Sequence, residues 1–496
     1  MNSKQMVMKK IIISIAVILS LSAMTLNAQQ NLRTGYFMDG YTYAYKMNPA
    51  FQGERGFLAI PVLGKTSLGI ESNLSLSTFL YPTSDGKLAT FLHPDVSADE
   101  FLGNMKYGNK VIANVDLPVI AFGFRTGKAY HTLDLSLRVD AGANLSKDLF
   151  RFMKVGSSDG TTSWNISDLG VRAEARAELA YGYSRKFGEN VTAGARVKML
   201  VGLARADVDM ENMNFKLSGE EWAVNAKGAA SLAGPVRIST MGETGTASDP
   251  SQNNYLDWGS IGIPPVEELI SYIKSPSSLG FAVDLGVSVD FLKYLTVSAS
   301  INDLGFISWK DMMRASTPET EWSFRGFENL SLDDGSAVEE QFGEIADEFL
   351  NAVNVSRDGI DDKASCSLSA TAHVGIEARV PFYERLTFGL LGTHRFAGAY
   401  SWTEGRLSAN LALLRGFDIS GSYAFSTFGS SLGAAMNLHF SGVTLFAGLD
   451  SFSPLLEVTP AYYIPVKSWN TNVNFGLNIA FGKYNGPYPK KKKVRD

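Results

Sequence analysis

The stretch GFAVDLGVSVDFLKYLTVSASIN, residues 280–302, decides how this chain folds. Large apolar residues alternate along it with small or acidic ones, first at Phe281, Val283 and Leu285 and, after a turn at 292–294, from Leu295 onward. A period of two residues places the two kinds of side chain on opposite faces of a β-strand. The stretch therefore predicts a β-hairpin with one apolar and one polar face.

Alternation alone also fits a half-buried strand of a soluble sandwich, but here it recurs from residue 66 to residue 482. Short turns and long loops alternate between runs of roughly ten residues, which is typical of transmembrane barrels. No run of 18 apolar residues follows the first 28 residues, and an open sheet edge is prohibitive in lipid. We therefore expect an all-β fold, a transmembrane antiparallel barrel of about fourteen strands with long extracellular loops that contain short helices.

The two ends of the chain differ from this pattern. Residues 1–28 combine Lys9 and Lys10 with a short apolar core, which indicates a cleaved secretory signal peptide rather than a membrane-anchoring helix. Residues 29–65 are aromatic-rich and interrupted by prolines, so we expect them inside or beneath the barrel as a hatch. Residues 66–482 would form the barrel, and 483–496 a basic periplasmic tail. This organisation predicts a location in the bacterial outer membrane, in contact with its lipid.

Charge and cysteine content exclude several classes. The formal net charge is −5 and falls to −8 once the three lysines of the signal peptide are removed, which argues against a nucleic-acid partner. The single cysteine, Cys366, cannot form an internal disulfide.

The hairpin at 171–203 is the most informative about the interior, because the charged residues at 172–178 and at 196–198 fall on one face of each strand. Opposite charges on neighbouring strands can pair across the ladder. The alternation predicts the following lumen-lining residues: Asp134, Arg138, Asp140, Arg172, Glu174, Arg176, Glu178, Arg196, Lys198, Asp284, His373, Glu377 and Arg379.

The long loops contain apolar segments. In the loop at 77–111, Ser97 and Glu100 have capping-box spacing ahead of Phe101 and Leu102, so a short helix is expected there. The stretch 304–365 is expected to be another great loop, with a helix that contains Phe342 and Phe349. These apolar residues either form a ligand-capture site or only cap the barrel, and the sequence leaves both readings open.

A short motif near the expected mature N-terminus carries a family resemblance. Asn48, Pro49 and Ala50, followed by about fourteen strands, resemble the FadL group of outer-membrane transporters for long-chain fatty acids and other hydrophobic molecules. The phrases MNPAFQGERGFLAIPVLG and INDLGFISW are similar to uncharacterised outer-membrane proteins of Bacteroides-like bacteria.

The resemblance implies that Asn48, Pro49 and Ala50 belong to a hatch, and that a fatty-acid-like ligand crosses by passive, hatch-gated diffusion and leaves through the wall. Pro118 is the candidate for that lateral opening, since a missing ladder bond weakens closure; the alternative is a tolerated bulge with no role in transport.

The sequence contains few signals for an enzyme or a metal site. The five histidines form no catalytic or metal-ligand motif, His373 and Glu377 would stand about 13 Å apart along a strand, and neither GxSxG nor HExxH occurs. Asp358, Asp361 and Asp362 lack the spacing of a calcium loop. We therefore expect no enzyme, metal or cofactor. The remaining alternative is a PorV-like barrel subunit whose long loops bind secretion-machinery proteins.

Overall fold

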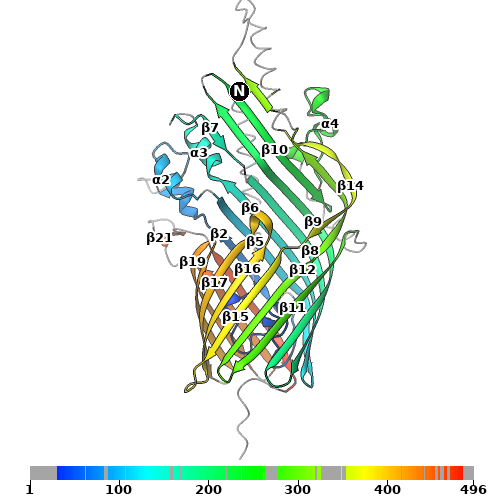
Figure 1. Cartoon of the computed structure of the whole chain (residues 1–496), viewed down its shortest axis with the longest axis vertical. Helices are drawn as coiled ribbons and strands as arrows, with labels where there is room; N and C mark the ends of the chain where they lie inside the picture. Colours follow the sequence, from blue (N-terminus) through cyan, green and yellow to red (C-terminus); the bar gives the residue numbers. More distant parts are fainter. Residues whose placement is uncertain are drawn as a thin grey trace, which may run out of the picture.

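The structure is a computed structural model of the chain (Figure 1). It describes residues 31–483 except 62, 83–87, 107, 157–159, 168, 219, 236, 261, 263–276, 319–320, 326–347, 349–353, 415, 441, 453–455, 459–462 and 466–469. The expected signal peptide, the basic tail beyond Lys483, Phe342 and Phe349 lie outside these residues. Among the described residues, none of the helices is long and apolar enough to cross a membrane.

Antiparallel strands form a closed ring, and the ring contains fourteen of them over the described residues when β1 and β2 are taken as two parts of the first strand. The ring closes because β2 pairs with β5 on one side and with β23 on the other. In order round the ring the strands are β1 (Gly56–Ala59) with β2 (Thr66–Ser72), β5 (Gly108–Thr126), β6 (Ala129–Ser146), β8 (Leu169–Phe187), β9 (Val191–Leu217), β11 (Leu279–Leu292), β12 (Leu295–Ser316), β15 (Ala370–Arg379), β16 (Leu386–Phe396), β17 (Trp402–Leu414), β18 (Phe417–Ser426), β19 (Gly429–His439), β20 (Val443–Phe452) and β23 (Thr471–Phe481). The expected barrel is confirmed.

The two faces of the wall differ as the alternation predicts. On β11, Phe281 and Leu285 are 44% and 47% exposed on the outer face, whereas Ala282 and Asp284 are fully buried inside. Aromatic residues gather on the outside near the short turns, among them Tyr181, Tyr183, Phe187, Phe291 and Phe382. An apolar outer band with aromatic rings at its end matches the hydrocarbon and headgroup layers of a bilayer. The barrel therefore belongs to the transmembrane class.

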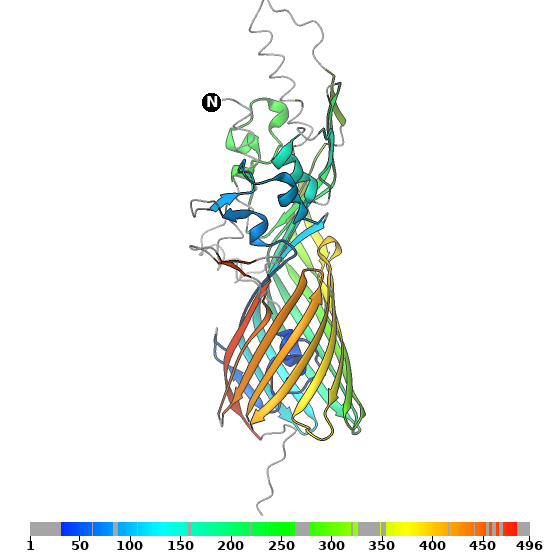
Figure 2. The same cartoon turned by 90° about the vertical axis from the view of Figure 1, so that its left-hand side faces the viewer.

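Smaller elements gather at the opposite, long-loop end (Figures 1 and 2). The N-cap expected at Ser97 is confirmed, because its hydroxyl accepts a hydrogen bond from the backbone N–H of Glu100. The elements at this end are β3 (Leu80–Pro82), β4 (Leu88–Thr90), α2 (Ala98–Gly103), α3 (Lys147–Val155), β7 (Ser163–Asn165), β10 (Trp222–Ala233), α4 (Met241–Thr244), β13 (Glu321–Phe324), β14 (Ser356–Ser367), β21 (Leu456–Val458), β22 (Tyr463–Pro465) and the short turns η3 (Leu76–Thr78), η4 (Pro250–Gln252), η5 (Trp258–Ser260) and η6 (Gly398–Tyr400). Two further short turns, η1 (Arg33–Gly35) and η2 (Ala44–Lys46), lie inside the barrel.

A sheet projects beyond the barrel at this end, and it corrects the prediction of a great loop at 304–365. Strand β12 continues to Ser316, and β14 pairs with its second half, from Phe306 to Ser316. Strand β10 takes the place of β11 between β9 and β12, and β13 pairs with β10. The prediction was wrong here because the alternation weakens above the barrel, where the strands pack against loops instead of lipid.

The first wall strand is interrupted, and its first part lies within the segment 29–65 that was expected to form the hatch. Residues 56–59 form β1 and pair with β23, with Ala59 opposite Asn478. Three residues further along β23, at Phe475, the opposing residue is Thr66, seven residues beyond Ala59. The first strand therefore contains four residues more than a regular ladder needs. On its other side, β5 has a bulge between Pro118 and Ile120.

Candidate functional site

A plug formed by residues 31–55 fills the lower half of the barrel, seen as the dark blue segment in Figures 1 and 2. It folds through the turns η1 and η2 and has no strand of its own. Its apolar side is a cluster of buried rings that packs on Phe57 of β1 and Phe446 of β20 and contains Tyr36, Phe37, Tyr41, Tyr43 and Tyr45. Burial of this many rings favours a plug held firmly in the lumen.

The Asn-Pro-Ala motif docks the plug on the wall. Asn48 Nδ2 donates to the carbonyl oxygens of Val287 and Ala299, at 3.3 and 3.4 Å, and Asn48 Oδ1 accepts from the N–H of Ala50 at 3.0 Å. Two wall glycines make this approach possible. A Cβ on Gly286 would lie 2.1 Å from Asn48 Oδ1, and one on Gly194 would lie 2.1 Å from the carbonyl oxygen of Pro49.

Arg33 joins the plug to three strands. Its guanidinium pairs with Glu71 of β2 and lies 3.3 Å from Glu404 of β17. Asp450 of β20 accepts from the backbone N–H groups of Arg33 and Thr34, at 2.5 and 2.6 Å. All these side chains are buried. The buried Arg33 guanidinium and these wall carboxylates neutralise each other only while the plug is in place.

A second set of charged contacts lies nearer the wall interruption. Lys46 of the plug and Lys65 of the wall share Asp116 on β5, at 3.2 and 2.9 Å. The hydroxyl of Tyr43 donates to the carbonyl of Gly64 at 3.0 Å, inside the interrupted segment. The plug therefore contacts the inner side of that segment directly.

Charged side chains of β6, β8, β9, β11 and β12 form a buried ion network above the plug. Arg196 lies 3.0 Å from Asp134 and 2.8 Å from Asp284, and the hydroxyl of Tyr45 in the plug donates to Asp134. Lys198 contacts Glu178 and Asp303, at 3.5 and 2.6 Å. The network links five wall strands to the plug.

Asp303 enters this network through an unusual backbone. Its φ is 60°, a left-handed value uncommon for a residue other than glycine, and it sits where the register between β11 and β12 shifts. The bulge turns the carboxylate inward, where Arg138 contacts it at 3.2 Å. Bulges that redirect a side chain are frequent next to functional sites.

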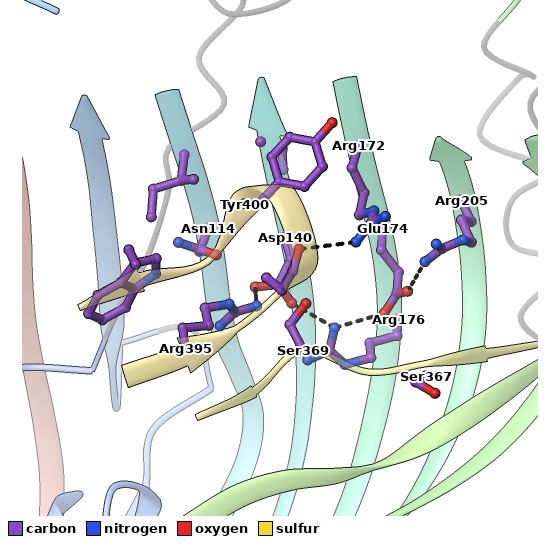
Figure 3. Close-up of a pocket in the computed structure, with 15 residues that line it drawn as sticks. Asn114, Asp140, Arg172, Glu174, Arg176, Arg205, Ser367, Ser369, Arg395 and Tyr400 are labelled. Atoms are coloured by element: carbon purple, nitrogen blue, oxygen red, sulfur yellow. Dashed lines mark hydrogen bonds and ion pairs between the residues drawn. The ribbon is translucent and has the colours of Figure 1, made fainter. Parts of the chain in front are cut away.

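The described residues form small cavities in the remaining lumen, and two of them are lined by charged side chains. The inner cavity, about 60 Å³, borders the plug and is lined by Arg33, Lys46, Arg138, Lys198, Asp303 and His373 among others. The outer cavity, about 40 Å³, is lined by four arginines together with Asp140, Glu174, Ser367, Ser369 and Tyr400 (Figure 3). Arg395 and Trp402 border both. Each holds only a few water molecules, so neither passes a molecule of several carbon atoms in this state.

The predicted lumen-lining residues all point inward, and most belong to one of two groups. Asp134, Arg138, Glu178, Arg196, Lys198 and Asp284 belong to the ion network, while Asp140, Arg172, Glu174 and Arg176 surround the outer cavity. His373 borders the inner cavity and contacts the hydroxyl of Thr393. Glu377 is half-buried near the short-turn end, and Arg379 lies 3.7 Å from Asp39 of the plug.

The predicted capture residues have a different setting. Phe101 is fully buried in a packed cluster with Leu74, Phe91, Val96, Met105 and Phe150, and Leu102 packs against it. Phe91 stacks on Phe101 with ring centroids 4.4 Å apart. This arrangement is a small packed core at the long-loop end, and Phe101 lines neither of the two cavities described above.

Several residues of the site are absent from the sequence-based set: Arg33, Lys46, Lys65, Glu71, Asp116, Asp303, Arg395, Glu404, Arg406 and Asp450. Glu404 and Arg406 alternate inward in the same way as the predicted residues and could have been found. Arg33 and Lys46 lie in a segment without a period. The one sequence signal for them is that charged residues are few in this aromatic-rich segment.

A family model matches residues 49–450, and its description is a family of unknown function (DUF5723). The chain belongs to this family. The match spans the last residues of the plug and almost the whole wall, including the interrupted strand and the arginines of the outer cavity. No curated protein matches the sequence.

Solved structures of similar strand arrangement include the toluene transporter TbuX of Ralstonia pickettii, at 10% identity and a TM-score of 0.40, with 92% of this chain and 98% of that chain covered. A FadL homologue of Pseudomonas aeruginosa matches at 12% identity and a TM-score of 0.37, covering 92% and 99%. The toluene transporter TodX of Pseudomonas putida follows at 8% identity and 0.36, covering 89% and 94%. The fold assignment rests on the strand ladder itself, and the resemblance to proteins of Bacteroides-like bacteria stays a prediction.

Proposed function

We propose that this protein is an outer-membrane channel through which small hydrophobic molecules enter from the long-loop end and leave sideways into the membrane. The interrupted first strand is the observation that carries the proposal. The plug in the lower half of the barrel blocks a straight path. The four extra residues between β1 and β2 interrupt the regular ladder, where Leu63 still accepts a hydrogen bond from the N–H of Leu477 of β23 at 2.8 Å.

The surroundings of the interruption fit a lateral exit. Leu63, Val119 and Ile120 are exposed on its outer side, where they would meet lipid. Pro118 lacks a backbone N–H and lies beside the bulge of β5, so the neighbouring strand is weakened at the same level. The inner cavity reaches this place from inside the barrel, since Asn31 and Asp116 line it and both bond Lys65.

The plug supplies the gate in this proposal. Tyr43 holds Gly64, and Lys65 bonds both Asn31 of the plug and Asp116 of the wall, at 2.7 and 2.9 Å. A small shift of the plug would therefore release the inner side of the interrupted segment without unfolding the barrel. Asn48, Pro49 and Ala50 anchor the far side of the plug and serve as its pivot.

Deletion of residues 61–64 tests the proposal. It removes the four extra residues and restores a regular register between the first strand and β23, so the wall should close while the barrel still folds. We expect uptake of toluene and of a fluorescent dodecanoate analogue by outer-membrane vesicles to fall at least fivefold. A matched deletion of the exposed turn 381–384 should leave uptake unchanged. Undiminished uptake by a folded 61–64 deletion variant would falsify the lateral route.

A second candidate function comes from the projecting sheet. A strand needs about 9–11 residues to cross a bilayer, whereas β9 has 27 and β12 has 22. The surplus length builds a rigid sheet beyond the membrane, which suits a subunit that binds secretion-machinery proteins. Cross-linking in intact cells from Ile360, an exposed residue of β14, would capture one stoichiometric protein in that case, and the 61–64 deletion would leave the capture unchanged.

A further inference from the structure

We propose that the outer cavity is a binding site for a small oxyanion, that is, a carboxylate or phosphate group. The inference concerns a different place from the wall interruption and does not depend on lateral passage, because a barrel with a closed wall would keep this cavity. It rests on three observations: convergent arginines, a surplus of donors, and the size of the cavity.

Four guanidinium groups converge on the cavity from three strands. Arg172 and Arg176 come from β8, Arg205 from β9 and Arg395 from β16 on the facing side (Figure 3). The carboxylates that line the same cavity are Asp140 and Glu174. Cations therefore outnumber anions two to one on the surface that a ligand would meet, and a partly buried site screens this excess poorly.

The acidic partners do not use up the donors. Asp140 bridges Arg176 and Arg395 at 2.6 and 2.8 Å, and Glu174 bridges Arg176 and Arg205 at 3.0 and 2.8 Å. Asp207 stands behind the lining and holds Arg172 and Arg205, at 2.9 and 2.8 Å. These contacts keep the guanidinium groups in place, and each engages only some of the N–H groups of its arginine.

The four arginines carry more N–H donors than their hydrogen bonds use. Four guanidinium groups carry about twenty N–H donors, and seven hydrogen bonds to described residues engage them. Within the described part of the chain, Arg176 Nε, Arg205 Nε and Trp402 Nε1 are buried without an acceptor. Trp402 itself is only 4% exposed and borders the cavity. Buried donors without acceptors are costly, and an oxyanion supplies the missing acceptors.

The cavity selects the size and class of the ligand. A volume of about 40 Å³ has room for a few waters or one carboxylate or phosphate group. The hydroxyl groups of Ser367 and Ser369 add short donors on the same lining. Guanidinium forks match planar and tetrahedral oxyanions in two-point contacts, so this donor set favours an oxyanion over a halide.

The test titrates the purified full-length protein in detergent with sodium phosphate and, separately, with sodium acetate, using calorimetry. We expect saturable binding of one or both anions. Arg172→Gln and Arg395→Gln should each weaken it at least tenfold. Arg314→Gln is the matched control, since Arg314 forms an exposed ion pair on the projecting sheet and should leave the affinity unchanged. Far-ultraviolet circular dichroism verifies that each variant retains the barrel.

A third titration with decanoate separates the sources of the oxyanion. Binding of decanoate that is much tighter than that of acetate, with the same dependence on Arg172 and Arg395, assigns the group to the head of an amphipathic molecule. Binding of phosphate without this preference assigns it to a free ion, and both outcomes support the site. Absence of saturable binding by all three anions, or affinities equal in Arg172→Gln, Arg395→Gln and Arg314→Gln, overturns it.

Discussion

The plug-filled barrel and the sheet that projects from it use the same strands in two different environments. Within the barrel, Val197 and Met199 of β9 face outward and are 46% and 64% exposed, as lipid-facing residues are. Further along the same strand, Met213 and Phe215 pack against Val224 of β10 and Trp322 of β13. One alternating strand therefore serves a bilayer at one end and a protein core at the other.

Charged residues show the same contrast. In the lumen several charges share buried partners, as Arg33 does with Glu71, Glu404 and Asp450. In the projecting sheet the ion pair of Arg314 and Asp361 is largely exposed, at 56% and 40% of the two side chains. The same residue types should therefore matter far more in the barrel than in the sheet, since solvent screens exposed pairs.

The largest effect is expected from Gly286→Val. The new side chain would collide with Asn48 and Pro49, so the plug cannot dock. Ion conductance across planar bilayers and protease cleavage within 31–55 should each rise at least tenfold. Gly421→Val is the control, since a Cβ there meets nothing within 4 Å. A Gly286→Val protein that stays closed and protected would show that the plug is held without the motif.

Arg33→Met should have the next largest effect. It removes the cation of the buried Glu71 and leaves Glu404 and Asp450 with Arg406 alone. Removal of one partner of a buried ion pair typically costs about 3–5 kcal/mol. The free energy of unfolding in urea, measured in lipid vesicles, reports this loss. Arg314→Met, the surface counterpart, should change it by less than about 1 kcal/mol. Equal losses in the two variants would contradict the contrast between barrel and sheet.

Met199→Arg tests which part of the strands faces lipid and which part lies beyond the membrane. A cation on the lipid face costs up to about 2–4 kcal/mol, the most near the middle of the bilayer, so the unfolding free energy in vesicles should fall by up to that amount. Ile360→Arg, at an equally exposed apolar residue of β14 (61% exposed), should leave it nearly unchanged. A comparable loss for Ile360→Arg would place β14 within the membrane.

The smallest effect concerns the loop that holds α4. Arg357 donates two hydrogen bonds to Glu243, and these bonds hold the pKa of the Glu243 carboxyl below its usual value of 4.5. Because the folded pKa is lowered, the stabilisation is complete above pH 4.5 and is lost as the pH falls through the folded pKa. Hydrogen exchange of amides 241–246, corrected for intrinsic rates, should quicken slightly between pH 7 and pH 3, and Arg357→Gln should remove this difference.

Much of the barrel could be read from residue order, because period-two alternation has a direct physical cause. Each outward residue meets lipid and each inward one meets polar lumen, so Phe281 and Asp284 reveal their faces without any tertiary information. The inward set on β6, β8 and β9 followed from the same argument. The hatch at Asn48, Pro49 and Ala50 came from a resemblance instead, since its segment has no period.

The interruption at 60–65, the bulge at Asp303 and the projecting sheet were decided by the tertiary structure. Each is a matter of register or of long-range pairing, and local sequence specifies neither. Pro118 marks a weakened ladder, but only the pairing of β1 and β2 with β23 reveals four surplus residues beside it. Likewise, alternation says that Arg172 and Arg395 point inward, yet only closure of the ring brings residues more than 200 positions apart to one cavity.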